Sequence, residues 1–150
     1  ICDKVAVMNE GQIHQLDNPH QIINNPKSLF VSSFILGNNI LRLSFDKNKL
    51  KSSIGIIEVE NLLINTKIEF LSVSPKSFSL NESINGKAKV IAKEFLGEFY
   101  IYKVQVSDIS LRVRTNINQN IKIGKKCEIS LIKGSQVFIF PGGYKRIIAK

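Results

Sequence analysis

Period-two alternation of apolar and polar residues most constrains how this chain can fold, and it runs through most of the sequence after residue 40. Leu111 and Val113 alternate with Arg112 and Arg114, which places the two pairs on opposite faces of a strand. Strands rich in Ile, Val, Phe and Tyr are expected at residues 67–73, 87–93, 98–106, 110–114, 126–131 and 136–140. Many short strands joined by short turns predict a mainly β fold, a closed or partly closed antiparallel β-barrel over residues 41–140.

Residues 1–36 follow a different pattern, a β-hairpin followed by two short helices. Residues 4–8 and 12–16 are extended, and a glycine in the turn between them can take a positive φ. The pair Asn-Pro occurs at 18–19 and again at 25–26. Asn is a good N-cap and Pro fits the first helical position, so each pair predicts a helix start.

Three parts are therefore expected: an appendage over residues 1–36, the barrel over 41–140 and a basic tail over 141–150. Residues 45–52 are rich in Lys, Asp and Ser and predict a long irregular connection. The tail is expected to be frayed, as chain ends often are.

The net charge of +9 is concentrated near the end of the chain. Residues 1–100 carry 11 Lys and Arg against 10 Asp and Glu, whereas residues 101–150 carry 10 against 2. Such asymmetry is typical of a surface that contacts nucleic acid or a membrane, and equally of a solvated strand face. Apolar runs are shorter than the roughly 20 residues that a membrane span requires. Cys2 and Cys127 lack metal-ligand spacing and predict free thiols in a reducing compartment.

Several short motifs carry a family resemblance. The opening segment contains DKV at 3–5, NEG at 9–11 and the two Asn-Pro pairs, and it resembles the end of the nucleotide-binding domain of ABC importers. The stretches INGKAKVIAKEFLGEFYIYKVQV (84–106) and IKIGKKCEISL (121–131) resemble the accessory oligonucleotide-binding-type domain, the transport-associated domain, that ends these ATPases. Because Ile1 is not an initiator Met, we expect a fragment of a longer subunit.

The resemblance implies a role in transport. It implies a non-catalytic regulatory and dimerising C-terminal region of an ATP-hydrolysing importer subunit, which would form a homodimer. Contact with membrane permease subunits would hold it at the cytoplasmic face of the membrane, and the rest of the parent subunit would hold ATP and Mg²⁺. Ferric iron or a polyamine is the expected cargo. Ser74-Pro75-Lys76 stands where the family has Arg-Pro-Glu, so contacts made by that charged pair are not expected here.

The chain itself carries no motif for nucleotide chemistry. A phosphate-binding loop needs Gly, four residues, then Gly-Lys followed by Ser or Thr. The Gly-Lys pairs at 86–87 and 124–125 lack both the first glycine and the following hydroxyl residue. His14 and His20 are too few and too isolated for a metal site. We therefore expect no ATP hydrolysis, no cofactor and no metal in this chain alone.

Two groups of residues are candidates for contacts. The apolar alternation over residues 100–106 and 127–131 exceeds what the interior of one small barrel must bury. Tyr100, Tyr102 and Val104, which share one strand face, are therefore candidates for the homodimer interface. Arg112 and Arg114 face the other way and are candidates for contact with a small anion. The alternative is a free-standing barrel whose basic face and tyrosines bind single-stranded nucleic acid. Nucleic acid is not the expected partner, because tyrosines at period two are ordinarily core or interface residues.

Overall fold

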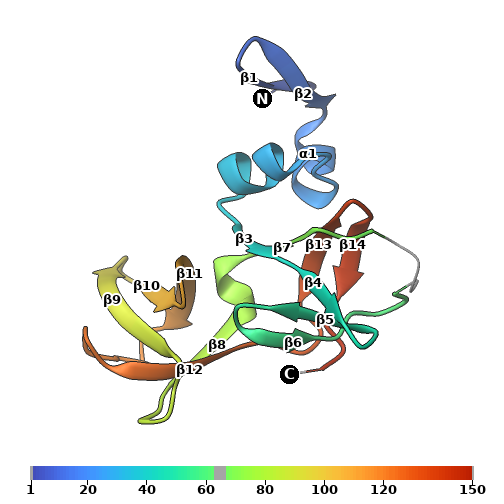
Figure 1. Cartoon of the computed structure of the whole chain (residues 1–150). Helices are drawn as coiled ribbons and strands as arrows, with labels where there is room; N and C mark the ends of the chain where they lie inside the picture. Colours follow the sequence, from blue (N-terminus) through green and yellow to red (C-terminus); the bar gives the residue numbers. More distant parts are fainter. Residues whose placement is uncertain (1, 63–66, 150) are drawn as a thin grey trace.

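The computed structural model describes residues 2–62 and 67–149, and within them the fold is mainly β. The paired strands are antiparallel and form a two-stranded, a five-stranded, a four-stranded and a three-stranded sheet. Figure 1 shows the N-terminal hairpin and short helices, in blue, projecting from the rest of the β structure. Among these residues, no helix combines the length and apolarity that crossing a membrane requires. The predicted mainly β fold, with a hairpin and two short helices in front, is confirmed.

The N-terminal hairpin forms as expected. Strand β1 (Val5–Asn9) pairs with β2 (Gln12–Asp17), with a bulge between Val7 and Met8. Gly11 takes a φ of +76°, a conformation that costs glycine little because it has no Cβ.

The first predicted helix start is confirmed and the second is wrong. Helix α1 (Pro19–Asn24) begins where expected, and the Asn18 side chain accepts a 2.9 Å bond from the backbone N–H of Gln21. Asn25, however, is the C-cap of α1, and its N–H donates to the Gln21 carbonyl at 2.8 Å. The following π-helix, η1 (Val31–Ile35), begins further along the chain. Just before it, Ser28 Oγ accepts a hydrogen bond from the Val31 N–H at 3.2 Å. Because Asn25 is the C-cap of α1, it does not act as the N-cap of the next helix.

Six strands outside the hairpin match the predicted segments, with small shifts at their ends. The largest sheet consists of β8 (Phe78–Glu82), β9 (Ala88–Phe95), β10 (Phe99–Val106), β11 (Ile109–Asn116) and β12 (Lys126–Leu131), in the order β11-β10-β9-β12-β8. A second sheet consists of β3 (Asn39–Arg42), β7 (Phe70–Val73), β13 (Gln136–Phe140) and β14 (Gly143–Arg146), in the order β14-β13-β7-β3. The short 3₁₀ turn η2 (Pro75–Ser77) connects β7 to β8.

Two segments expected to be irregular are strands. Within residues 45–52, β4 (Ser44–Asp46) pairs with β5 (Lys49–Ser52), and β6 (Gly55–Ile57) completes the three-stranded sheet. The β4–β5 turn has positive φ at both Lys47 and Asn48, the geometry of a tight hairpin turn. The expected frayed tail is also wrong, because β14 pairs with β13 and Ile147 bridges to Val59.

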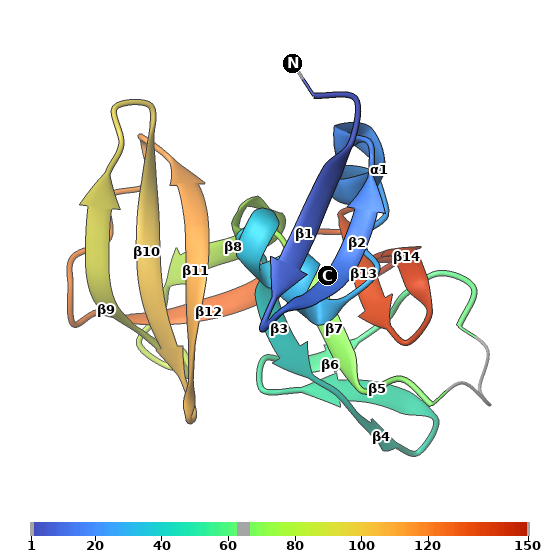
Figure 2. The ribbon, with the colours of Figure 1, turned by 90° about the horizontal axis from the view of Figure 1, so that it is seen from above.

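One hydrophobic core joins the three larger sheets, but strand pairing does not close them into a barrel in the described residues. Figure 2 shows β9, β10 and β11 side by side, apart from β3, β7, β13 and β14. The edge strands β11 and β8 lack a backbone ladder between them. Side chains satisfy these edges instead. On β11, the Asn39 side chain accepts a hydrogen bond from the Arg112 N–H and donates one to the Arg112 carbonyl, both at 2.8 Å. On β8, the Gln119 side-chain amide donates to the Leu80 carbonyl. The closed or partly closed barrel that the sequence predicts is not found closed in the described residues, where separate antiparallel sheets surround a shared core.

Candidate functional site

Tyr102 and Val104, two of the three candidate interface residues, lie in the core. Both are 0% exposed. The Tyr102 hydroxyl donates to the Gln119 carbonyl at 2.6 Å and accepts from the Ile121 N–H at 2.9 Å, so it ties the loop after β11 to β10. Burial raises the pKa of the Tyr102 phenol, because the charged phenolate would lose its hydration there. These two side chains have no free surface to offer a partner in this conformation.

Tyr100 is the candidate interface residue that reaches the surface. It is half-buried, and its ring lies 5.2 Å from that of Phe95 and 5.8 Å from that of Tyr102. The Lys93 ammonium lies 4.7 Å from the centre of the Tyr100 ring, a cation–π contact. Phe95, which lies at the end of β9 beside a turn and is not among the residues predicted from the sequence, is 53% exposed. A homodimer interface that includes Tyr100 stays a prediction.

Arg112 and Arg114 are exposed on the outer face of β11, as their alternation with buried Leu111 and Val113 predicts. The Arg114 guanidinium lies 3.7 Å from the centre of the Phe99 ring, so one of its faces is already covered. In the register, Arg112 is opposite Lys103 on β10, which adds a third positive charge to this face. A contact with a small anion here stays a prediction.

The nucleic-acid alternative needs stacking aromatics and basic side chains on the same surface. Tyr100 and Tyr102 are opposite Thr115 and Val113 in the register and face the core, whereas the arginines face outward. Phe99 does share the arginine face, but Arg114 covers it. The arrangement does not favour binding of bases.

The N-terminal hairpin presents an apolar outer face. Met8, Ile13 and Leu16 are each more than half exposed, and Met8 is opposite Ile13 in the register. On the other side, Val7 packs with Ile22 and Val31 in a small separate core. An exposed apolar strand face of this kind is typical of a surface that contacts another part of a protein.

Comparison with known proteins identifies relatives over most of the chain. It is 28% identical over 120 residues to the spermidine/putrescine import ATP-binding protein PotA of Mycoplasmopsis synoviae, which covers 72% of this chain and 26% of that protein. It is 24% identical over 138 residues to the Fe(3+) ions import ATP-binding protein FbpC of Haemophilus influenzae strain 86-028NP, and this match covers 87% of the chain and 39% of that FbpC protein. The FbpC protein of Fusobacterium nucleatum is 28% identical over 153 residues, a match that covers 93% of the chain and 37% of that protein.

The chain is homologous to the ATP-binding subunits of ABC importers. It matches a C-terminal region of these subunits and spans between about a quarter and two fifths of their length. No protein-family model matches the sequence.

The Ser74-Pro75-Lys76 departure from the family pattern lies at η2, between the four-stranded and five-stranded sheets. Backbone bonds hold the turn: the Ser77 N–H donates to the Ser74 carbonyl, and the Ile132 N–H donates to the Ser77 carbonyl, both at 2.9 Å. Lys76 is exposed, and within residues 2–62 and 67–149 it takes part in no ion pair. Here the turn is positioned by its backbone, without a charged pair.

The two cysteines differ in exposure, Cys2 being exposed and Cys127 buried. Both cysteines are free; Cys127 is buried, and this burial raises the pKa of its thiol. Across the described part of the chain, no group of three or more His, Cys, Asp and Glu side chains is arranged to hold a metal ion.

Proposed function

We propose that this chain is the C-terminal regulatory and dimerising region of the ATP-hydrolysing subunit of an ABC importer. The observation that carries the proposal is the homology to a C-terminal region of importer ATPases over 72% to 93% of the chain. The missing phosphate-binding loop fits this role, because ATP and Mg²⁺ would be held by the rest of the parent subunit.

The exposed face of the hairpin would dock on that remaining part. Met8, Ile13 and Leu16 form an apolar surface on a two-stranded sheet, and such a small sheet gains stability from a covering layer. In the proposal, strand β1 or β2 extends or covers a larger sheet of the nucleotide-binding domain.

Two copies of the β-rich part would meet at the end of the five-stranded sheet that carries Tyr100 and Phe95. Leu96 and Ile117 are also exposed and lie at the same end, because Phe99 beside the β9–β10 turn is opposite Asn116 in the register. Aromatic side chains such as those of Tyr100 and Phe95 are enriched at the centres of protein interfaces.

The dimer would work at the inner face of the membrane, bound to permease subunits, and would import ferric iron or a polyamine. The relatives support these two cargo classes, because PotA is a spermidine/putrescine import ATP-binding protein and FbpC is an Fe(3+) ions import ATP-binding protein.

Uptake in the source cell tests the transport role. A chromosomal variant that lacks codons 41–150 should lose or deregulate uptake of labelled spermidine or of labelled ferric iron, but not of both. Immunoblotting of the shortened subunit separates loss of function from loss of protein. Unchanged uptake of both cargoes at normal protein abundance would contradict the proposal.

Self-association of the purified chain tests the dimer. Phe95→Glu should weaken the dimerisation constant about tenfold or more in sedimentation equilibrium, because it places a charge at the centre of the contact. Ile56→Glu is the matched control, since Ile56 is 57% exposed on the separate three-stranded sheet. Equal effects of the two variants, or none, would place the interface elsewhere.

A further inference from the structure

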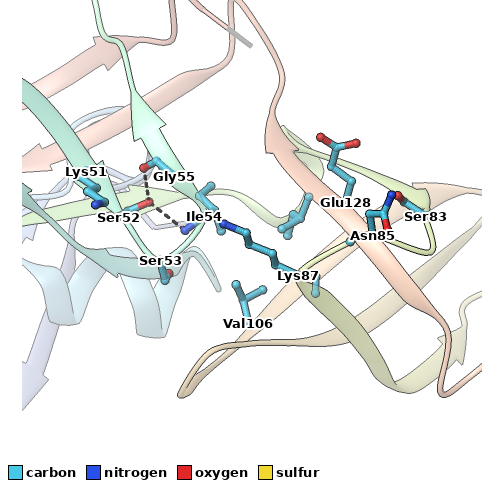
Figure 3. A pocket seen from close by; sticks show the side chains of 13 residues that line it. Lys51, Ser52, Ser53, Ile54, Gly55, Ser83, Asn85, Lys87, Val106 and Glu128 are labelled. Carbon is cyan, nitrogen blue, oxygen red and sulfur yellow. Dashed lines mark hydrogen bonds between the residues drawn. The ribbon is translucent and has the colours of Figure 1, made fainter.

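A cavity of about 440 Å³ lies between two turns of the β-rich part, away from Tyr100 and from the arginine face. One wall is the β5–β6 turn with Ile54, and the other is the β8–β9 turn with Asn85 and Lys87. Its volume is within the range of about 300–1,000 Å³ that small-molecule sites occupy. Figure 3 shows Lys87 extending from its turn toward the β5–β6 turn.

Both walls are held in place by local bonds. The Gly86 N–H donates to the Ser83 carbonyl at 3.0 Å, and a Cβ at Gly86 would lie only 2.1 Å from the Cys127 carbonyl oxygen, so this turn lies directly against β12. Across the cavity, Ser52 Oγ accepts from the Ile54 N–H at 3.2 Å and donates to the Gly55 carbonyl at 3.4 Å. A site formed in advance loses less entropy when a ligand binds.

The charged side chains of the cavity are not neutralised by one another. Lys51, Lys87 and Glu128 all line it, and in the part of the chain that the structure describes none of them takes part in an ion pair. Two ammonium groups and one carboxylate sum to a charge of +1. The apolar side of the cavity is formed by Ile129 and Val106, both buried in the core.

We infer that this cavity binds a small organic monophosphate that carries hydroxyl groups, such as a sugar or polyol phosphate. Lys51 and Lys87 would bind the phosphate, for which lysine is a common point-charge partner. The Glu128 carboxylate would accept hydrogen bonds from the ligand's hydroxyls, and the Asn85 amide would donate hydrogen bonds to them. Val106 would contact the carbon skeleton. This inference goes beyond the transport role and does not depend on it.

The charge pattern selects this class over simpler anions. An inorganic anion would leave the carboxylate of Glu128 and the apolar side unused, and it would gain only the contacts with the lysines. A polyamine would meet the two lysine ammonium groups and would be repelled by them.

The test is a titration of the isotope-labelled full chain with glucose 6-phosphate and glycerol 3-phosphate, followed by amide chemical shifts. We expect saturable shifts confined to residues that line the cavity, namely 51–55, 83, 85–88, 106 and 128–129. Lys87→Met should weaken the affinity about tenfold or more, as expected for loss of a charged hydrogen-bond donor. Lys133→Met is the matched control, because Lys133 is exposed in the turn after β12, does not line the cavity, and its replacement makes the same change in net charge.

Three results would overturn the inference. The first is the absence of saturable shifts up to about 10 mM, the weak end of measurable small-ligand binding. The second is an equal loss of affinity in Lys133→Met, which would indicate attraction to net charge alone. The third is binding of inorganic phosphate as tight as that of both organic phosphates, which would remove the role of Glu128 and the apolar side.

Discussion

Replacing Tyr102 by Phe tests whether a single buried hydroxyl holds the loop after β11 against the five-stranded sheet. The side chain is completely buried, and its oxygen makes two bonds of 2.6 and 2.9 Å to the backbone of Gln119 and Ile121. The phenylalanine ring keeps the packing, so the change removes only the oxygen. The N–H of Ile121, a residue 4% exposed, is then left in the core without its acceptor.

The size of the effect follows from these contacts. A buried hydrogen bond contributes about 1 kcal/mol net, and an unsatisfied buried donor costs about 1–3 kcal/mol. The Gln119 carbonyl lies in a half-buried residue and regains water, so the two losses do not add fully. We expect Tyr102→Phe to lower the free energy of unfolding by about 2–3 kcal/mol.

Urea unfolding followed by far-UV circular dichroism measures this difference through the midpoint, with the slope unchanged if the unfolded state is unaltered. Tyr100→Phe is the control, because among the described residues the Tyr100 hydroxyl makes no hydrogen bond. We expect the control to lose less than about 0.5 kcal/mol. Equal losses in the two variants would refute the role of the hydroxyl.

Three further changes test other parts of the core. Burial raises the pKa of Tyr102 and Cys127 above their ordinary values of 10.0 and 9.0, so the folded state resists their ionisation. The free energy of unfolding should therefore be at its full value below about pH 9 and fall as the pH rises, less steeply in Tyr102→Phe. A urea midpoint that stays flat up to about pH 11 would contradict this. Asn39→Ala removes both bonds to the backbone of Arg112 and should cost about 2 kcal/mol in urea unfolding, with faster amide exchange at Arg112 as the specific sign. Gly86→Ala forces a Cβ against the Cys127 backbone and should cost about 2–4 kcal/mol in thermal unfolding, whereas a loss below about 0.5 kcal/mol would show that the turn can move freely.

Local patterns predicted the bounds of some elements well. Strands β12 (Lys126–Leu131) and β13 (Gln136–Phe140) have the predicted bounds, and Asn18 caps α1 as expected. The hairpin β4–β5 was missed because its turn uses Lys47 and Asn48 at positive φ, where glycine would have been the recognisable signal.

Features that depend on distant contacts could not be predicted in the same way. Alternation placed Tyr102 and Val104 on one face but could not show that this face is covered by the chain's own core. Closure of the barrel depends on which edges meet, and here the side chain of Asn39 takes a place at the edge of β11 that a strand could have taken. The lysine-lined cavity unites Lys51 with Lys87 and Glu128, and no local pattern connects residues so far apart in sequence.

The junction between the N-terminal unit and the β-rich part is polar and buried, and this determines how the two parts can move. Ser32 on η1 and Ser72 on β7 are both 0% exposed and share a hydrogen bond, while the Asn38 amide donates to Ser72 at 3.1 Å and to Ser32 at 3.3 Å. Separating the two units would leave these hydroxyls without partners, whereas an apolar contact could slide at little cost. Asn39, the next residue, bonds the edge of β11. A displacement of the N-terminal unit would therefore act on both large sheets through one continuous set of directional bonds, as the role proposed above, in a subunit whose ATPase part moves, would require.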